Sequence, residues 1–245
     1  MKKIIFILII ALALVIFLNV KHTEEPIVDT SSIQKDTPTT EIQPAEETEV
    51  SYSFEYTNIH FSHSPTEAIN VSIDYPQFKD EKLNELNKKI ETLAKSKFKE
   101  SIENPEISQD ILLKESLAIK LANSSIVSIL CKGEYANSIS EHTNIISKVY
   151  NIHPLSLDEY ETTDLINVSD EFINLFKDKI LKNENHANYL INYTLEDYKA
   201  LILASNLYMT NKELVMIVSL SQEAENFIEV TFSKNEIKDF LISTL

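Results

Sequence analysis

The sequence contains one glycine, one cysteine, no tryptophan and no arginine. A single glycine, Gly133, is too few for the glycine-rich loops that cradle phosphates, so nucleotide-binding motifs of that kind are excluded. A single cysteine, Cys131, permits no internal disulfide, and its apolar neighbours Ile129 and Leu130 predict a buried thiol. We therefore expect a fold that depends on its hydrophobic core, and we expect no cofactor.

Positive charge is also scarce. The 245 residues carry 22 Lys against 38 Asp and Glu, a net charge of −16, and residues 51–245 alone carry 18 Lys against 30 acids. Without arginine there is no planar guanidinium group for bidentate contact with phosphates. Nucleic acid and anionic lipid headgroups are therefore excluded as favoured partners.

The one long apolar run lies at the N-terminus. Lys2 and Lys3 precede it, and it continues without a polar residue from Ile4 to Leu18. The run is longer than the usual core of a cleavable signal peptide, and no small-x-small cleavage site follows it. We predict that residues 1–21 form an uncleaved, single-pass membrane anchor, with the bulk of the chain outside the cytoplasm. A cleaved signal peptide is the alternative.

Residues 22–50 are rich in Thr, Glu, Pro, Ser and Gln. This composition buries too little apolar surface to offset the entropy of ordering, so we predict a disordered stalk. Residues 51–245 then form the extracytoplasmic domain, either as one unit or as two subdomains, 51–152 and 153–245.

Hydrophobic periodicity predicts the first elements of this domain. Alternating apolar residues indicate a bulged strand over 51–61 and a second strand over 69–75, and apolar residues at helical spacing follow over 80–101. Extended runs at 113–121 and 126–135 flank Asn123-Ser124-Ser125, whose turn chemistry predicts a hairpin. A further run, 142–150, is expected to pair with them.

Capping residues mark the later elements. Ser169 precedes an amphipathic helix with Phe172, Ile173, Phe176 and Ile180 on its inner face, and a second helix is expected from Thr194, with Asp197 three residues on. Strands follow near 207–209, 214–220 and 227–232. Ser233 and Glu236 then form a capping box for an amphipathic terminal helix, whose Ile237, Phe240 and Leu241 face the sheet.

Strands and helices are grouped rather than strictly alternating. This arrangement predicts the α+β class, with antiparallel sheets and helices packed on one side.

Three stretches resemble a known extracytoplasmic domain: INVSIDYPQF with LNELNKKI, the block from SIVSILCKGEYANSIS to NIHPLSLDEY, and LVMIVSL with FIEVTFSKNEIKDFL. The domain precedes the catalytic domain of a Bacillus peptidoglycan deacetylase and forms the ectodomain of a lysozyme-sensing anti-sigma factor. None of the three stretches is a catalytic signature. The resemblance therefore implies wall-polymer or lysozyme binding, and it implies neither catalysis nor transcriptional control.

The resemblance also suggests a ligand site. The family has a Gly-Gly-Ala-His turn after the tyrosine of its middle strand, whereas here Tyr135 is followed by residues 136–141 without glycine and then by His142. Tyr135 and His142 are therefore the candidate ligand-binding residues. The missing glycines leave the path of the turn open, because positions with positive φ favour glycine. Capping of the loop backbone is the alternative role for His142.

Two other groups of residues are candidates for chemistry. His60 and His63 are weak metal-ligand candidates, because two histidines need further ligands and point to opposite faces of a strand unless the chain turns at Ser62. Asp158, Glu159, Glu161 and Asp164 surround Tyr160, where a solvated acidic loop is the alternative to acid/base work. No Gly-x-Ser-x-Gly elbow is present.

The functional hypothesis is a membrane-anchored binding or sensory domain at the bacterial surface. Its expected partners are the membrane, through residues 1–21, and either peptidoglycan or a cationic protein such as lysozyme. The alternatives are a wall-modifying enzyme, either a metal-dependent deacetylase built on His60 and His63 or a hydrolase, and a structural subunit of an envelope complex.

Overall fold

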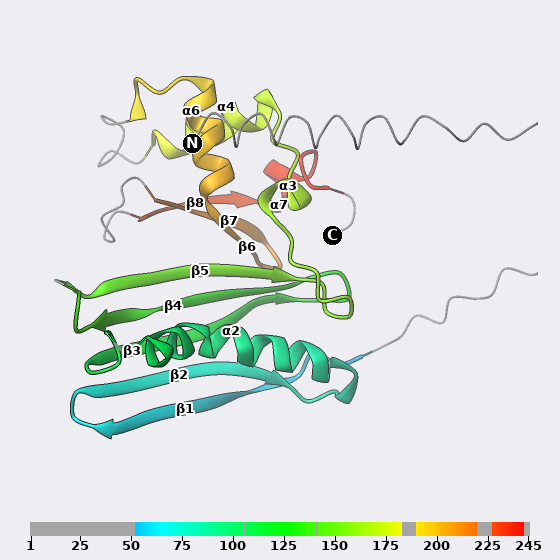
Figure 1. Ribbon diagram of the computed structural model, residues 1–245. Helices are drawn as coiled ribbons and strands as arrows, with labels where there is room; N and C mark the ends of the chain where they lie inside the picture. The colour runs from blue at the N-terminus through cyan, green and yellow to red at the C-terminus, as the bar shows by residue number, and fades with distance from the viewer. Residues whose placement is uncertain (1–51, 105, 141, 183–189, 220–226, 243–245) are drawn as a thin grey trace, which may run out of the picture. The chain divides into compact units, whose positions relative to one another are not determined.

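The computed structural model describes residues 52–104, 106–140, 142–182, 190–219 and 227–242. Residues 50–245 form one compact unit, which contains a five-stranded and a three-stranded sheet (Figure 1). The predicted anchor, 1–21, and the predicted stalk, 22–50, lie outside the described residues. Within the described part of the chain, no helix is both long and apolar enough to cross a bilayer.

The first half of this unit builds the five-stranded sheet. Its strands are β1 (Tyr56–Thr66), β2 (Ile69–Phe78), β3 (Ile111–Ala122), β4 (Val127–Asn137) and β5 (Asn144–Ile152), in the order β1-β2-β3-β4-β5. The predicted β3–β4 hairpin and its pairing with β5 are confirmed. Asn123 supplies the turn, because its Oδ1 accepts hydrogen bonds from the backbone of Ser125 and Ile126, both at 2.9 Å.

The prediction of purely antiparallel sheets is wrong at one place, because β2 and β3 pair in parallel. Parallel neighbours need a long crossover, and here the crossover is a short 3₁₀ turn (Glu81–Leu83) followed by the 20-residue helix α2 (Asn84–Glu103). The class is α+β, with one mixed sheet and one antiparallel sheet.

Helix α2 covers one face of the mixed sheet. Leu86, Ile90 and Ala94 recur once per turn and are buried against apolar residues of β2, β3 and β4. The predicted helix over 80–101 is therefore confirmed, and the chain enters it through Asp80, whose carboxylate accepts from Lys82 N at 3.0 Å.

The start of the first strand differs from the prediction. Strand β1 begins at Tyr56, five residues after the predicted start, and its irregularity lies between His63 and Thr66. Tyr52 and Phe54 precede the strand, and their aromatic rings contact each other. The ring of Phe54 also lies edge-on to that of Phe78, with 5.7 Å between the centroids. The alternating aromatic residues at 52 and 54 therefore reflect packing on the core rather than strand pairing.

The second half contains α3 (Thr162–Leu165), α4 (Asp170–Ile180), α6 (Leu195–Ala204), β6 (Asn206–Met209), β7 (Glu213–Ser219), β8 (Phe227–Ser233) and α7 (Lys234–Ile237). The predicted caps are present. Ser169 Oγ accepts from Phe172 N at 3.4 Å, and Thr194 and Asp197 form a reciprocal capping box. The strands form an antiparallel sheet in the order β6-β7-β8.

The terminal helix is shorter than predicted. Ser233 and Glu236 form the expected capping box, but α7 is a single turn. The chain leaves the helix because residues 240–242 bond instead to 165–167, with Asn167 N donating to Phe240 O at 2.8 Å and Ile242 N to Leu165 O at 3.1 Å. Ile237 is nevertheless buried, and Phe240 and Leu241 pack on the same core as predicted.

The two sheets pack face to face. Helices α4 and α6 cover one face of the three-stranded sheet, while the other face contacts the mixed sheet through Leu130, Tyr208, Val215 and Ile217. Each sheet thus has its helices on one side, as predicted.

A buried hydrogen-bond chain joins the two sheets. Met209 N donates to Ser128 Oγ at 3.1 Å, Ser128 Oγ donates to Asn151 Oδ1 at 2.7 Å, and Asn151 Nδ2 donates to Leu207 O at 2.7 Å. Asn151 is only 7% exposed and Ser128 is fully buried. The chain therefore satisfies backbone groups of β6 that would otherwise be buried without partners.

Replacing Asn151 tests this junction. Asn151→Leu leaves Leu207 O and the Ser128 hydroxyl without their partners, so we expect the free energy of unfolding to fall by about 2–3 kcal/mol. Asn206→Leu is the matched control, because Asn206 makes only a long, partly exposed bond to Ser147 O, at 3.4 Å. Urea denaturation measures both, and equal losses would contradict the assignment.

Candidate functional site

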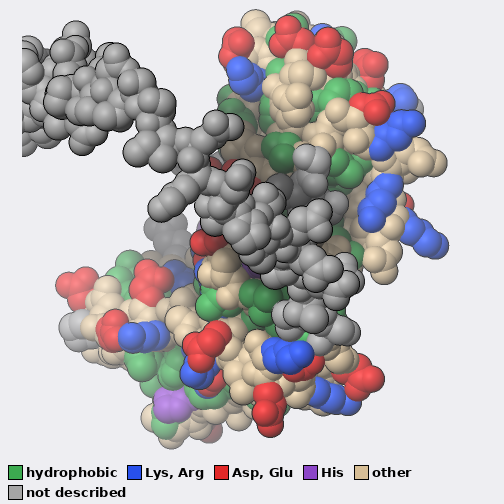
Figure 2. All heavy atoms as spheres, turned by 90° about the vertical axis from the view of Figure 1, so that its right-hand side faces the viewer, with side chains coloured by type: hydrophobic (Ala, Val, Ile, Leu, Met, Phe, Trp, Pro, Cys, Tyr) green, Lys and Arg blue, Asp and Glu red, His purple; other side chains and the backbone are tan. Residues whose placement is uncertain are grey.

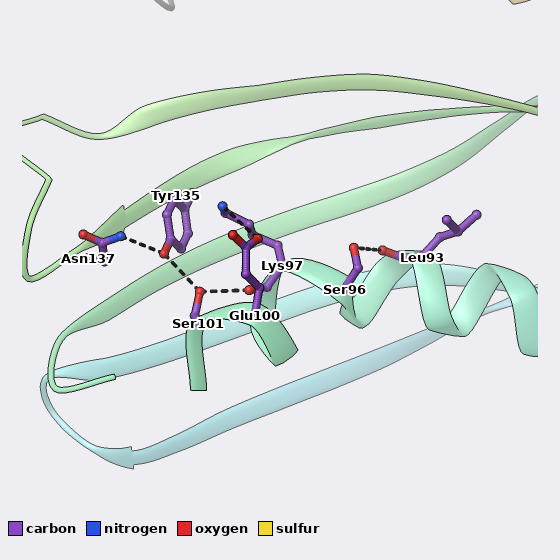
Figure 3. Close-up of polar contacts among 7 residues, drawn as sticks. All are labelled: Leu93, Ser96, Lys97, Glu100, Ser101, Tyr135 and Asn137. Atoms are coloured by element: carbon purple, nitrogen blue, oxygen red, sulfur yellow. Dashed lines mark hydrogen bonds and ion pairs between the residues drawn. The ribbon is translucent and has the colours of Figure 1, made fainter. Parts of the chain in front are cut away.

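Tyr135 lies on β4 with its ring toward the last turns of α2 (Figure 3). Its hydroxyl lies 3.0 Å from Ser101 Oγ and accepts from Asn137 Nδ2 at 2.8 Å. Lys97 Nζ lies 4.5 Å from the centroid of the ring, a distance at which a cation is attracted to the π face. Tyr135 is 6% exposed, so this predicted binding residue is a buried link between strand and helix.

Asn137 shapes the turn that follows. Its Oδ1 accepts from Ile139 N and Ser140 N, each at 2.9 Å, and Ser138 Oγ donates to Glu106 O at 3.0 Å. None of residues 137–140 has positive φ. An asparagine side chain therefore organises the turn that has glycines in the resembling family.

His142 is exposed in the bend before β5, and its ring makes no hydrogen bond with any described residue. No hydrogen bond or ring contact joins it to Tyr135 within that part of the chain. The two predicted ligand residues thus differ in environment, one buried and one in solvent.

The structure separates His60 and His63. Strand β1 continues through Ser62 without a turn. Successive side chains of a strand point to opposite faces, so His60 and His63, three positions apart, lie on opposite faces. His60 Nδ1 lies 2.9 Å from Asp74 Oδ1, whereas the ring of His63 packs 5.1 Å from Phe98 of α2. In the described ranges, no three His, Cys, Asp or Glu side chains gather as a metal site.

The acidic residues near Tyr160 have separate partners. Asp158 accepts from Ser156 Oγ at 2.6 Å, Glu159 pairs with Lys89 of α2 at 2.8 Å, and Asp164 caps Glu161 N at 2.8 Å. Lys89 also donates to the carbonyl of Leu157, the one described non-glycine residue with positive φ, at 65°. These carboxylates anchor and cap a loop, and they do not form a facing pair.

A buried carboxyl that the sequence analysis missed lies beneath α2. Glu115 occupies an inward position of β3 between Leu113 and Leu117, and it is 8% exposed. Its cross-strand partner is Gly133, where a Cβ would overlap the Lys114 carbonyl and press on Glu115. The only glycine thus makes room for this strand pair. The sequence offered one indication of this buried carboxyl, because Glu115 occupies an apolar position in the alternating pattern of Leu113 and Leu117.

We call Glu115, Lys97, Lys148, Cys131 and Tyr150 the Glu115 cluster. Burial raises the pKa of Glu115 to about 7, although the charges of Lys148 and Lys97 act in the opposite direction. Burial, and then the charge of Glu115, raise the pKa of the Cys131 thiol to about 12. Burial also raises the pKa of Tyr150 to about 12. Glu115 can therefore take up or release a proton near neutral pH, whereas burial favours the protonated, weakly nucleophilic form of the Cys131 thiol.

Comparisons with known proteins bear on the fold. No protein-family model matches the sequence, and no curated protein is similar enough to count as a relative. A DUF3298 family protein from Pseudomonas aeruginosa PAO1 has a similar crystal structure, with a TM-score of 0.52 and 9% identity over 79% of this chain and 96% of that one. A DUF3298 member from Bacteroides fragilis, 12% identical over 78% and 94%, has a TM-score of 0.49. At such identities the likeness concerns the fold alone.

The glycine opposite Glu115 can be tested by Gly133→Ala. The added methyl group meets backbone atoms of β3, so we expect the free energy of unfolding to fall by about 3 kcal/mol. Glu134→Ala is the control on the same strand, because that side chain is exposed on the opposite face. A change below about 0.5 kcal/mol in Gly133→Ala would show that β3 and β4 adjust freely.

The buried carboxyl predicts a pH dependence of stability. The pKa of Glu115 is raised in the folded chain, from 4.5 to about 7, so the folded state holds the proton more tightly. The stability that the protonated Glu115 side chain contributes to the fold is fully present below pH 4.5, the ordinary pKa, and is lost as the pH rises through about 7. The free energy of unfolding of Glu115→Gln, relative to that of the wild type, should therefore rise by about 3 kcal/mol as the pH is raised from about 4 to about 8.

Denaturant unfolding at several pH values measures this gain. Glu134→Gln is the matched control, since Glu134 is exposed on the opposite face of the same sheet. The prediction fails if the Glu115→Gln difference is the same at both ends of the pH range.

Proposed function

We propose that residues 51–245 form a binding or sensory domain held outside the bacterial cell membrane by residues 1–21. Its ligand is a cell-wall polymer or a wall-active protein such as lysozyme. The apolar run from Ile4 to Leu18, behind Lys2 and Lys3, supports the anchoring, and the resemblance of three sequence stretches to a wall-associated domain supports the ligand class.

The acidic charge of the folded part is the observation on which this proposal chiefly rests. Residues 51–245 carry 18 Lys and no Arg against 30 acids, so a cationic protein is the complementary partner. On the face in Figure 2, acidic side chains are spread among lysines rather than gathered in one patch. A spread of this kind favours long-range attraction over one strong ion pair.

The alternative of a wall-modifying enzyme has less support. A metal-dependent deacetylase needs ligands that converge, and His60 and His63 point to opposite faces of β1. A hydrolase needs either an activated nucleophile or a facing pair of carboxylates. Burial raises the pKa of the Cys131 thiol, which opposes activation, and Asp158 and Glu159 near Tyr160 each have a separate partner.

Binding to a cationic wall-active protein tests the proposal directly. The full chain in nanodiscs should bind immobilised hen lysozyme, with the affinity falling at least about tenfold between about 50 mM and about 500 mM salt. Succinylated lysozyme, whose lysines are made acidic, is the control and should not bind. Absence of binding at low salt, or binding that high salt leaves unchanged, would refute electrostatic recognition.

The membrane placement needs its own measurement. Protease added to intact cells should degrade the folded part, while a cytoplasmic marker protein stays whole. Protection of residues 51–245 until the cells are lysed would contradict the proposed topology.

A further inference from the structure

A cleft of about 430 Å³ lies between the two sheets. One wall is formed by β4 and β5, chiefly through Lys132, Glu134 and Ile145. The other wall is formed by β7 and β8, through Ile217, Phe227 and Glu229. A volume of this size, with a largely apolar lining and a few charged groups, is typical of binding sites.

Among the described residues, the buried hydrogen bonds that join the two sheets lie at one end of β4 and β5, and the cleft lies toward the other end. Ser128 of β4 and Asn151 of β5 are cross-strand partners, and both hydrogen-bond to β6. They lie at the end of the two strands where Val127 pairs with Ile152. The cleft begins further along the same two strands, beside the pairs Lys132↔Ser147 and Glu134↔Ile145. Leu130, with Tyr208 and Val215, fills the space between these points.

One ion pair crosses the open end. Lys132 Nζ lies 3.1 Å from Glu229 Oε1, and their side chains are 58% and 46% exposed. An exposed pair of this kind is worth little, so it can part when a ligand enters. Glu134 has no ion pair with any described residue, which leaves a negative charge available at the rim.

Both walls end in edge strands. β5 is the last strand of the mixed sheet, and β8 is the last strand of the three-stranded sheet. Asn206 Nδ2 donates to Ser147 O at 3.4 Å and so occupies part of the β5 edge. Among the described strands, only β4 pairs with the segment Asn144–Ile146, which leaves its outer edge unpaired, and Ile145 is 42% exposed. An edge strand beside an apolar cleft is the arrangement that binds extended peptides by strand addition.

We infer that this cleft binds an extended basic segment of a partner protein, which pairs with the edge of β5 and places an apolar side chain between Ile145 and Phe227. Every second residue of an added strand points to the same face, and Glu134 is the cross-strand partner of Ile145 on that face. A basic residue two positions from the apolar one therefore reaches the rim at Glu134 and Glu229. A basic segment also suits a chain with a net charge of −16. The inference rests on the proposed binding function and names the site and the form of the ligand.

A model peptide tests the chemistry. The probe is the octapeptide Val-Ser-Lys-Ser-Val-Ser-Lys-Ser, the Val-Lys peptide, in which Val and Lys lie on one face of an extended strand. It is fluorescently labelled and titrated against the full chain in nanodiscs. Fluorescence anisotropy should give saturable binding, and an otherwise identical peptide with Glu in place of Lys should bind at least about tenfold more weakly. A peptide methylated on alternate backbone nitrogens should also lose binding, because strand addition needs those N–H groups.

Matched variants locate the site. Ile145→Gln should weaken binding of the Val-Lys peptide at least about tenfold, since it removes the apolar side chain at the cleft. Ile139→Gln is the control, because Ile139 is an exposed isoleucine, 60% accessible, outside the cleft lining. Equal affinities for Ile145→Gln and the wild type, equal losses in both variants, or no saturable binding would overturn the inference.

Lysozyme binding by the same variants separates this inference from the proposed function. Peptide binding by a chain that does not bind lysozyme would support the cleft and refute the lysozyme proposal. Lysozyme binding by a chain that does not bind the peptide would refute the cleft and leave the proposal standing.

Discussion

The buried hydrogen bonds of Asn151 and Ser128 are the constraint on which the arrangement of the two sheets depends. Leu207 O and Met209 N belong to β6, the edge strand of the second sheet, and both would be buried without partners if the sheets moved. Leaving such groups unsatisfied costs more than an average hydrogen bond contributes, so the junction has one arrangement and little freedom to slide. Apolar contacts through Leu130 and Tyr208 then add area without direction.

The position of this junction accounts for the cleft between the sheets. The sheets are tied near the Ile152 end of β5, so the Asn144 end of that strand opens into a cleft. On the opposite face of the mixed sheet, α2 covers Glu115, which no cation neutralises completely. One face of the sheet thus holds a proton-binding carboxyl and the other a cleft.

Several elements could be predicted because their causes are local. The Asn123 turn, the Ser169 cap and the Thr194–Asp197 capping box each involve residues within four positions of one another, and all three are present. The errors arose where distant residues decide the outcome. The parallel pairing of β2 with β3 depends on the path of α2, and the early end of α7 depends on bonds to residues 165–167. Phe54 packs on Phe78 and Tyr52 packs on Phe54, and neither residue joins the first strand.

The candidate sites divide along the same line. By itself the sequence determined the acidic charge, the lack of arginine, the single thiol and the strand and helix periodicities, because these are properties of composition and of near neighbours. Only the tertiary structure decided that Tyr135 is buried, that His60 and His63 face apart, and that Glu115 lies over Gly133. Those outcomes depend on strand register and on sheet packing, which join residues far apart in the chain and which no local pattern encodes.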